Sequence, residues 1–272
     1  YRIGDIADRA ALRGAFAGAD AVVHLAGRAH VMQDDATDPL AEYKRINVEG
    51  TRAVADSAAD AGVRRVVFLS SIKVNGERTD GRPFSETDIP APEDSYGVTK
   101  REAEDALFGI AQARGIEAVC LRPPLVYGPG VRANFAALMR LCDSALPLPF
   151  GGVTGNRRSL IYIGNLTSAI AAALAHDNAA GRVFLVRDGE DLSTATLMRA
   201  LRQASGRSAR LVPVPAAWLK AALCLTGRRA MAERLLGSLT IDDSAFRTAL
   251  GWTPPFSVAE ALQATMRGSR LS

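Results

Sequence analysis

Cysteine is scarce in this chain, with three residues in 272. Cys120, Cys142 and Cys224 stand far apart among apolar neighbours, as is typical of small core residues. Their number and spacing argue against a disulfide framework and against a cysteine metal site. The histidines show no ligand spacing either, so no metal is predicted: His24, His30 and His176.

Long apolar runs are absent too. No segment has the roughly 20 apolar residues that a membrane-spanning helix needs, and the first residues carry no targeting pattern. The sequence therefore predicts a cytoplasmic protein without a membrane partner. The net charge is only +4 and the arginines are scattered, which argues against a nucleic-acid partner but suits a phosphorylated small molecule.

What the chain does contain is 48% hydrophobic residues, enough for a full-sized core. Apolar, β-branched segments at 20–27, 64–71 and 116–123 alternate with helical patterns at 38–61 and from 94 onward. This alternation is typical of a parallel sheet that helices cover on both faces. The predicted fold class is therefore α/β with a doubly wound, Rossmann-type parallel sheet.

Ligands of such a sheet bind at the carboxyl ends of its strands. Chemistry is accordingly expected at residues 26–28, 70–73 and 122–127. The second half of the chain has a different character, with short helices broken by glycine and proline. A strand near 182–188 is expected to return to the first sheet.

Tyr96 and Lys100 lie four positions apart at the head of a predicted helix, so their side chains share one face. An ammonium beside a phenol stabilises the phenolate and lowers its pKa from about 10, which makes a usable acid or base. The same spacing also arises by chance between two solvated residues. An active-site role is favoured by the two neighbouring strand ends. One carries Ser70 and Ser71, and the other is LRPPLVYGPG (121–130).

Several segments together resemble the extended short-chain dehydrogenase/reductase superfamily. The match is to its NAD-dependent epimerase/dehydratase family, and there to the UDP-glucose 4-epimerase-like branch that acts on nucleotide sugars. In family order the segments are GDI (4–6), DAVVHLAG (20–27), NVEGT (47–51), VVFLSSIKVNG (66–76), YGVTK (96–100), LRPPLVYGPG (121–130) and ALGWTPP (249–255). The resemblance covers nearly the whole chain. It implies a dinucleotide-binding domain over 1–130 and a mainly substrate-binding, smaller mixed lobe over 131–272.

The resemblance also implies catalytic roles. Tyr96 matches the acid/base, and Lys100 matches the residue that lowers its pKa and holds the nicotinamide ribose. Ser71 matches the hydroxyl that aligns the substrate oxygen, although a serine there can also simply satisfy a strand end. Asn47 matches a helix asparagine that organises the site, or else makes a helix-interior polar contact.

The implied cofactor is NAD or NADP. Asp5 and Ile6 match the pair that receives the adenine, although Asp5 is also compatible with an ordinary loop carboxylate. The implied cofactor-binding residues are Asp5, Ile6, Leu25, Ala26, Gly27, Asn47, Ser70, Tyr96, Lys100 and Pro123.

The implied substrate is a nucleotide sugar. Arg158 matches an arginine that clamps the diphosphate, with a surface ion pair as the alternative. Lys73 either lies near the sugar or is a solvated loop lysine, and Leu125 replaces a sugar-contacting asparagine. The implied substrate-binding residues are Ser71, Lys73, Asn134, Leu148, Phe150 and Arg158.

The reaction expected is redox chemistry at sugar C4, by a 4-epimerase or a 4-ketoreductase of surface polysaccharide precursor synthesis. Dehydration is disfavoured because Ile72 and Lys73 stand where the 4,6-dehydratases of the family have an acidic pair. Two alternatives remain: a reductase of a steroid-like or phenolic carbonyl, and a non-catalytic dinucleotide-binding member of the superfamily.

Two further expectations concern the whole molecule. The sequence has no G-x-x-G-x-x-G turn, so the sheet is expected to be N-terminally incomplete, without the first β-α-β unit. A homodimer is expected through the helix that begins near Asp38 and the helix that bears Tyr96. Their apolar stripes are Leu40, Tyr43, Val54 and Ala58 on the first and Ala103, Ala106, Leu107 and Ile110 on the second.

Overall fold

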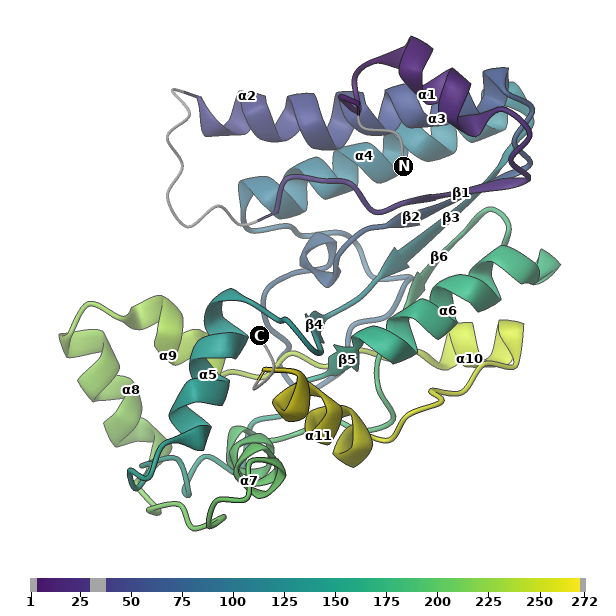
Figure 1. Cartoon of the computed structure of the whole chain (residues 1–272). Helices are drawn as coiled ribbons and strands as arrows, with labels where there is room; N and C mark the ends of the chain where they lie inside the picture. Colours follow the sequence, from purple (N-terminus) through teal and green to yellow (C-terminus); the bar gives the residue numbers. More distant parts are fainter. Residues whose placement is uncertain (1–3, 30–37, 270–272) are drawn as a thin grey trace.

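The computed structural model describes residues 4–29 and 38–269, so His30 lies outside the described residues. Four parallel strands form the main sheet in the order β1-β2-β3-β6 (Figure 1). Their bounds are Ala21–His24 for β1, Arg65–Leu69 for β2, Glu117–Arg122 for β3 and Arg182–Leu185 for β6. The predicted α/β class with a parallel sheet is confirmed.

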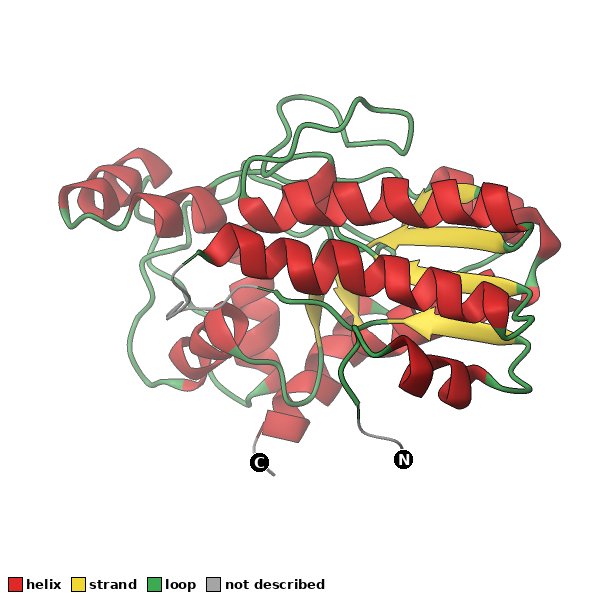
Figure 2. Ribbon diagram, turned by 90° about the horizontal axis from the view of Figure 1, so that it is seen from above, coloured by secondary structure: helices red, strands yellow, loops and turns green. Residues whose placement is uncertain are grey.

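Helices cover both faces of this sheet. On one face lie α4 (Ser95–Arg114) and a continuous rod of α2 (Pro39–Tyr43), the π-helical η1 (Lys44–Glu49) and α3 (Gly50–Asp60). Figure 2 shows these two long helices side by side over the strands. On the other face lie α6 (Ile163–Ala175) and α10 (Ser244–Leu250). The short α1 (Arg9–Phe16) packs against α3.

Successive strand residues point to opposite faces, so both faces of the sheet need apolar side chains. Val66 and Phe68 of β2 pack under α3 and α4, whereas Val67 between them packs towards α6. In β3 the same alternation places Cys120 on the first face and Leu121 on the second. Because both faces of the sheet are covered, its strands appear in the sequence as unbroken apolar runs.

The remaining elements form a lobe beside the sheet. Its small parallel sheet consists of β4 (Leu125–Tyr127) and β5 (Leu160–Tyr162). Its helices are α5 (Ala133–Asp143), α7 (Thr194–Ala204), α8 (Ala216–Leu225), α9 (Arg229–Leu236) and α11 (Val258–Ser269). Short 3-10 turns η2 (Ile72–Val74) and η3 (Asp177–Ala179) complete the fold. No helix within the described ranges is both long enough and apolar enough to cross a bilayer.

The apolar stripes expected to form a dimer face are mostly interior. Among them Leu40 is exposed and Ile110 is partly buried. The other members are buried within the chain: Tyr43, Val54, Ala58, Ala103, Ala106 and Leu107. Four of them pack between the helices and the sheet, namely Val54, Ala58, Ala103 and Leu107. The stripes therefore reflect core packing and do not by themselves support a dimer.

A buried ion pair joins α4 to the end of β3. Glu104 accepts hydrogen bonds from Nε and Nη2 of Arg122 at 2.8 and 2.5 Å, and both side chains are almost fully buried. Nη1 of Arg122 donates to Oδ1 of Asn75, directly after η2, at 2.9 Å. Three segments that are distant in the sequence are thereby fixed to one another.

We predict that Glu104→Ala lowers the free energy of unfolding by about 3–5 kcal/mol, because it leaves the Arg122 charge buried and unpaired. The double variant Glu104→Met with Arg122→Met should lose less stability than the single variant, because it buries no unpaired charge. Urea unfolding followed by circular dichroism measures both. Glu102→Ala is the matched control, because Glu102 lies on the same helix as Glu104 but makes an exposed ion pair with Lys44. This variant should lower the free energy of unfolding by less than about 1 kcal/mol. A Glu104→Ala variant as stable as this control would contradict the prediction.

Candidate active site

The helix α4 presents Tyr96 in its first turn. Asp94 caps this helix, and its Oδ1 accepts a hydrogen bond from the Gly97 amide at 2.7 Å. The Tyr96 side chain is hydrogen bonded to Ser71, which follows strand β2. The structure therefore brings together two of the three residues predicted to be catalytic.

Burial raises the pKa of Tyr96 from 10 to about 12. The hydrogen bond with Ser71 lowers this pKa, whereas the nearby carboxylate of Asp94 adds to the rise. The direction is opposite to the one expected from the Tyr-Lys spacing. The expectation considered only the charge of a nearby lysine, whereas desolvation of the phenol is the largest cause of the shift and Lys100 is not among its causes. In this structure the Tyr96 hydroxyl is a proton donor at neutral pH.

Lys100 lies one turn further along α4 and is 3% exposed. Its Nζ donates a hydrogen bond to the Leu69 carbonyl at 2.8 Å and lies 4.3 Å from the centre of the Phe68 ring. Burial lowers the pKa of Lys100 from 10.5 to about 8, although Glu104 opposes the shift. The amine is thus held at the carboxyl end of β2 in an environment that disfavours its charge.

Gly27 follows β1 and faces the same amine. A Cβ atom at this position would lie 3.2 Å from Oδ1 of Asn47 and 3.3 Å from Nζ of Lys100. Any larger residue would therefore crowd both side chains. Asn47 accepts a hydrogen bond from the Arg28 amide at 2.7 Å, and its Nδ2 donates to the Arg28 carbonyl and to Oγ1 of Thr99 at 3.1 Å each. It ties the loop after β1 to the helix of Tyr96.

Four of the predicted cofactor residues line one open cavity of about 770 Å³ between α1 and β1: Asp5, Ile6, Leu25 and Ala26. Asp5 is exposed, and its Oδ1 accepts a hydrogen bond from the Ala7 amide at 2.9 Å, as an ordinary loop carboxylate also does. Ile6 packs against Gly50 at the start of α3.

Two observations fit the nicotinamide half of a dinucleotide. Oγ of Ser70 is buried and has no hydrogen-bond partner among the residues described, and an orphaned buried hydroxyl of this kind needs a ligand or a water. Gly27 fits as well, because a residue without a Cβ lets the backbone lie close to Oδ1 of Asn47 and Nζ of Lys100, the residue expected to hold the nicotinamide ribose. Pro123 is buried, and its carbonyl accepts a hydrogen bond from the Ile72 amide at 3.0 Å, which holds the loop of Ser71 against the end of β3.

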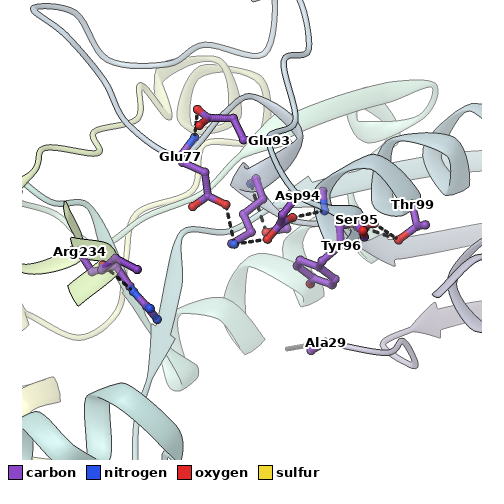
Figure 3. A network of polar contacts seen from close by, with 12 residues as sticks. Ala29, Glu77, Glu93, Asp94, Ser95, Tyr96, Thr99 and Arg234 are labelled. Carbon is purple, nitrogen blue, oxygen red and sulfur yellow. Dashed lines mark hydrogen bonds and ion pairs between the residues drawn. The ribbon is translucent and has the colours of Figure 1, made fainter. Parts of the chain in front are cut away.

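Lys73 makes two ion pairs and is 20% exposed, so it is not a solvated loop lysine, and its place near the sugar stays a prediction. Its Nζ lies 2.6 Å from Oε1 of Glu77 and 2.6 Å from Oδ2 of Asp94. Figure 3 shows Asp94 next to Tyr96 and Glu77 further away, with dashed contacts from one amine to both carboxylates. Because Asp94 also caps α4, Lys73 joins the loop after β2 to the first turn of α4.

Arg158 is partly buried between β5 and the start of α7. Its Nη1 donates to the Gly237 carbonyl at 3.4 Å, and burial lowers its pKa, with Glu77 raising it and Arg234 lowering it further. The charges of Glu77 and Arg234 therefore act on Arg158, although the three residues are distant in the sequence. In Figure 3 Arg234 lies on the far side of Glu77 from Tyr96.

The other predicted substrate residues do not gather around Tyr96. Asn134 is exposed on α5, and within the described ranges it makes no hydrogen bond to the other predicted residues. Leu148 and Phe150 are buried in the core of the lobe, so their part in a nucleobase pocket stays a prediction. Leu125 is exposed.

Sequence reasoning missed several residues that the structure places at the site. Asp94 had a signal, since an aspartate directly before a helix is a common N-cap. Arg234 had none, because nothing in a sequence relates it to Arg158 or to Glu77. The partners of Lys73 and Asn47 were missed for the same reason.

Comparisons with known proteins agree with this geometry. The model of the NAD dependent epimerase/dehydratase family matches residues 2–186. A UDP-glucose 4-epimerase of Vibrio cholerae is 47% identical over 245 residues, which cover 90% of this chain and 75% of that protein. An N-acetyl-alpha-D-glucosaminyl-diphospho-ditrans,octacis-undecaprenol 4-epimerase of Escherichia coli O157:H7 is 29% identical over 216 residues, covering 79% of this chain and 63% of that protein.

A solved structure shares the fold. The crystal structure of UDP-glucose 4-epimerase from Thermotoga maritima with UDP-glucose superposes with a TM-score of 0.77 at 22% identity. The match covers 98% of this chain and 83% of that one. The family resemblance inferred from the sequence motifs is confirmed, and so is the expected NAD or NADP dependence at the level of the family.

We predict that Lys100 makes stability fall as the pH falls. Its unfolded-state pKa is 10.5 and its folded-state pKa is lowered to about 8. Between these values the unfolded chain binds the proton and the folded one does not. From about pH 9.5 to about pH 7.5 this group should lower the free energy of unfolding by about 2 kcal/mol.

Denaturant unfolding of the protein and of Lys100→Met at both pH values tests this. The variant should lose this part of the pH dependence, whereas Lys44→Met, at an exposed lysine, should retain it. An unchanged pH dependence in Lys100→Met would show that the folded-state pKa is close to normal.

Proposed function

The chain belongs to the NAD-dependent epimerase/dehydratase family, and we propose that it is a nucleotide-sugar 4-epimerase that uses NAD or NADP. The observation that carries this proposal is the hydrogen bond between Tyr96 and Ser71, with Lys100 and Asn47 around Gly27 behind them. A 4-ketoreductase needs the same residues for its reductive step and is the second candidate.

The chemistry assigned to the chain is proton transfer at one sugar oxygen. Bound NAD(P) supplies the acceptor and donor of the hydride. Ser71 holds the C4 oxygen by a hydrogen bond. Tyr96, once it has lost its own proton on ligand binding, takes the hydroxyl proton during oxidation and returns it during reduction. In an epimerase the keto sugar rotates within the site before it is reduced on its other face. No cofactor is therefore consumed overall.

The residues after Ser71 favour this reaction over loss of water. Ile72 is buried, and Lys73 is engaged by Glu77 and Asp94. Neither can supply the additional acid and base that elimination across two carbons requires. The partly buried Arg158, with Arg234 near it, supports a substrate that carries a diphosphate. An apolar steroid-like or phenolic carbonyl would leave these guanidinium groups without a role.

We further propose a cytoplasmic role in making precursors of surface polysaccharide, because the motifs resemble that branch of the family. The homodimer stays a prediction. Among the stripe residues first assigned to it, Leu40 is the exposed one at 42%, so a dimer through α2 and α4 would rest mainly on polar contacts.

Product analysis distinguishes the candidates. The intact protein is incubated with UDP-glucose or UDP-N-acetylglucosamine without added reduced cofactor, and the C4 epimer is sought by proton NMR. Its appearance supports the epimerase. Turnover that occurs only with a 4-keto sugar and consumes NADPH stoichiometrically supports the ketoreductase, and inactivity in both assays contradicts the proposal.

We predict that Tyr96→Phe lowers kcat by a factor on the order of a hundred or more, because the acid/base group is lost. Folding should be preserved, since the change removes one hydroxyl and little volume. Tyr162→Phe, in the lobe, is the control and should retain activity. Steady-state kinetics with thermal unfolding in parallel measure both, and near-normal turnover of Tyr96→Phe would rule out its role.

A further inference from the structure

Lys73 belongs to the immediate surroundings of the pair formed by Ser71 and Tyr96. Oγ of Ser71, which is hydrogen bonded to Tyr96, also accepts a hydrogen bond from the Lys73 amide at 3.3 Å. Burial is the main cause of the raised pKa of Tyr96, and the Asp94 carboxylate adds to the rise. The same carboxylate lies 2.6 Å from Nζ of Lys73. Charges at the end of the Lys73 side chain therefore act on the place where the C4 oxygen is proposed to bind.

These surroundings contain more negative than positive charge. The Lys73 ammonium is paired with the carboxylates of Glu77 and Asp94. A further carboxylate adjoins them, because Oε1 of Glu93 accepts a hydrogen bond from the Glu77 amide at 3.4 Å. Figure 3 shows Glu93 directly beside Glu77. We call Lys73, Glu77, Glu93 and Asp94 the Lys73 cluster, and in it three carboxylates stand against one ammonium.

The Lys73 cluster has little capacity for another anion. An anionic ligand would reach Nζ of Lys73 only by displacing a carboxylate that lies 2.6 Å away. Asp94 is held in place, because it also caps α4 through the Gly97 amide. Glu77 would stay close by on the same loop, so its charge would still repel the ligand. A neutral hydroxyl meets no such obstacle, since an ammonium has three N–H donors and the two carboxylates use two of them.

Positive charge is found on the other side of Glu77. Burial lowers the pKa of Arg158, Glu77 raises it, and Arg234 lowers it further, so both charges lie within reach of this guanidinium. In Figure 3 Arg234 and Tyr96 lie on opposite sides of Glu77. Negative charge thus surrounds the proposed C4 position, and the arginines lie beyond it. This separation suits a ligand with an anionic diphosphate and an uncharged sugar.

We propose that Glu77, through the Lys73 cluster, makes the site select nucleotide sugars with a neutral group at C6 and reject uronic acids, which carry a carboxylate there. The inference rests on the proposed function, because that function places the C4 oxygen on Ser71. C6 is attached to the ring carbon next to C4, so a carboxylate at C6 stands within a few bond lengths of the C4 oxygen. It would therefore face the Lys73 cluster, and like charges at short range repel.

Two nucleotides that differ only at C6 test the proposal. Isothermal titration calorimetry of the intact protein with NAD present gives the dissociation constants of UDP-glucose and UDP-glucuronate. UDP-glucuronate should bind at least about tenfold more weakly, because one repulsion at short range is worth a factor of this order even in a partly hydrated site. The measurement reads binding directly and does not depend on turnover.

Variants of the Lys73 cluster should move this ratio in opposite directions. Glu77→Gln removes a charge at almost constant size and should strengthen UDP-glucuronate about tenfold relative to UDP-glucose. Lys73→Gln removes the only cation of the cluster and should weaken UDP-glucuronate relative to UDP-glucose. Asp80→Asn is the matched control, because Asp80 is an exposed carboxylate on the same loop, and it should leave the ratio unchanged. A residue that only held the loop in place would affect both nucleotides alike.

The possible results separate this inference from the proposed function. Equal affinities for the two nucleotides, or a ratio that Glu77→Gln leaves unchanged, would overturn selection by charge without touching the C4 chemistry. Failure of both nucleotides to bind would overturn the proposed substrate class and this inference with it. Circular dichroism of each variant checks that the fold is intact, so that a shift in the ratio reports on charge.

Discussion

The ion pair between Glu104 and Arg122 holds together the three segments that carry the candidate site. Glu104 lies about two turns after Tyr96 on α4, Arg122 ends β3 beside Pro123, and Asn75 belongs to the loop of Ser71. A buried pair of this kind adds little net stability compared with apolar packing. What it does impose is a single arrangement, because any shift of α4 along the sheet would leave one charge unpaired.

A second connection acts at the other end of the same loop. Lys73 binds Asp94, and Asp94 caps the first turn of α4. The loop between Ser71 and Asn75 is therefore tied to α4 on both sides of the Tyr96 hydroxyl. The hydrogen bond between Ser71 and Tyr96 is a consequence of these two fixed points. Asn47 adds a third, because it joins Thr99 of the same helix to the loop after β1.

The strands, the helices and the placement of Ser71 and Tyr96 could be predicted because they follow from local patterns. Apolar runs of strand length mark β2 and β3, Asp38 and Asp94 mark helix starts, and a spacing of four places Tyr96 and Lys100 on one face. The environment of these groups could not be predicted in the same way. The partners of Lys73 and the neighbour of Arg158 are set by tertiary contacts, and the buried positions of Leu148 and Phe150 depend on how the lobe closes. The predicted direction of the Tyr96 pKa shift was wrong, because the shift depends on burial and the degree of burial is a property of the whole fold.

Burial has the same effect on both members of the Tyr-Lys pair. It raises the pKa of Tyr96 and lowers that of Lys100, so each group is shifted towards its neutral form. Neither group is among the causes of the other's shift, and burial disfavours a Tyr96 phenolate at neutral pH. The same low polarity strengthens any charge that is brought into the site, since electrostatic interactions grow as water is excluded. For the acid/base role proposed for Tyr96, the raised pKa means that the phenol keeps its proton until a charged ligand arrives, so proton release would depend on occupancy of the cleft.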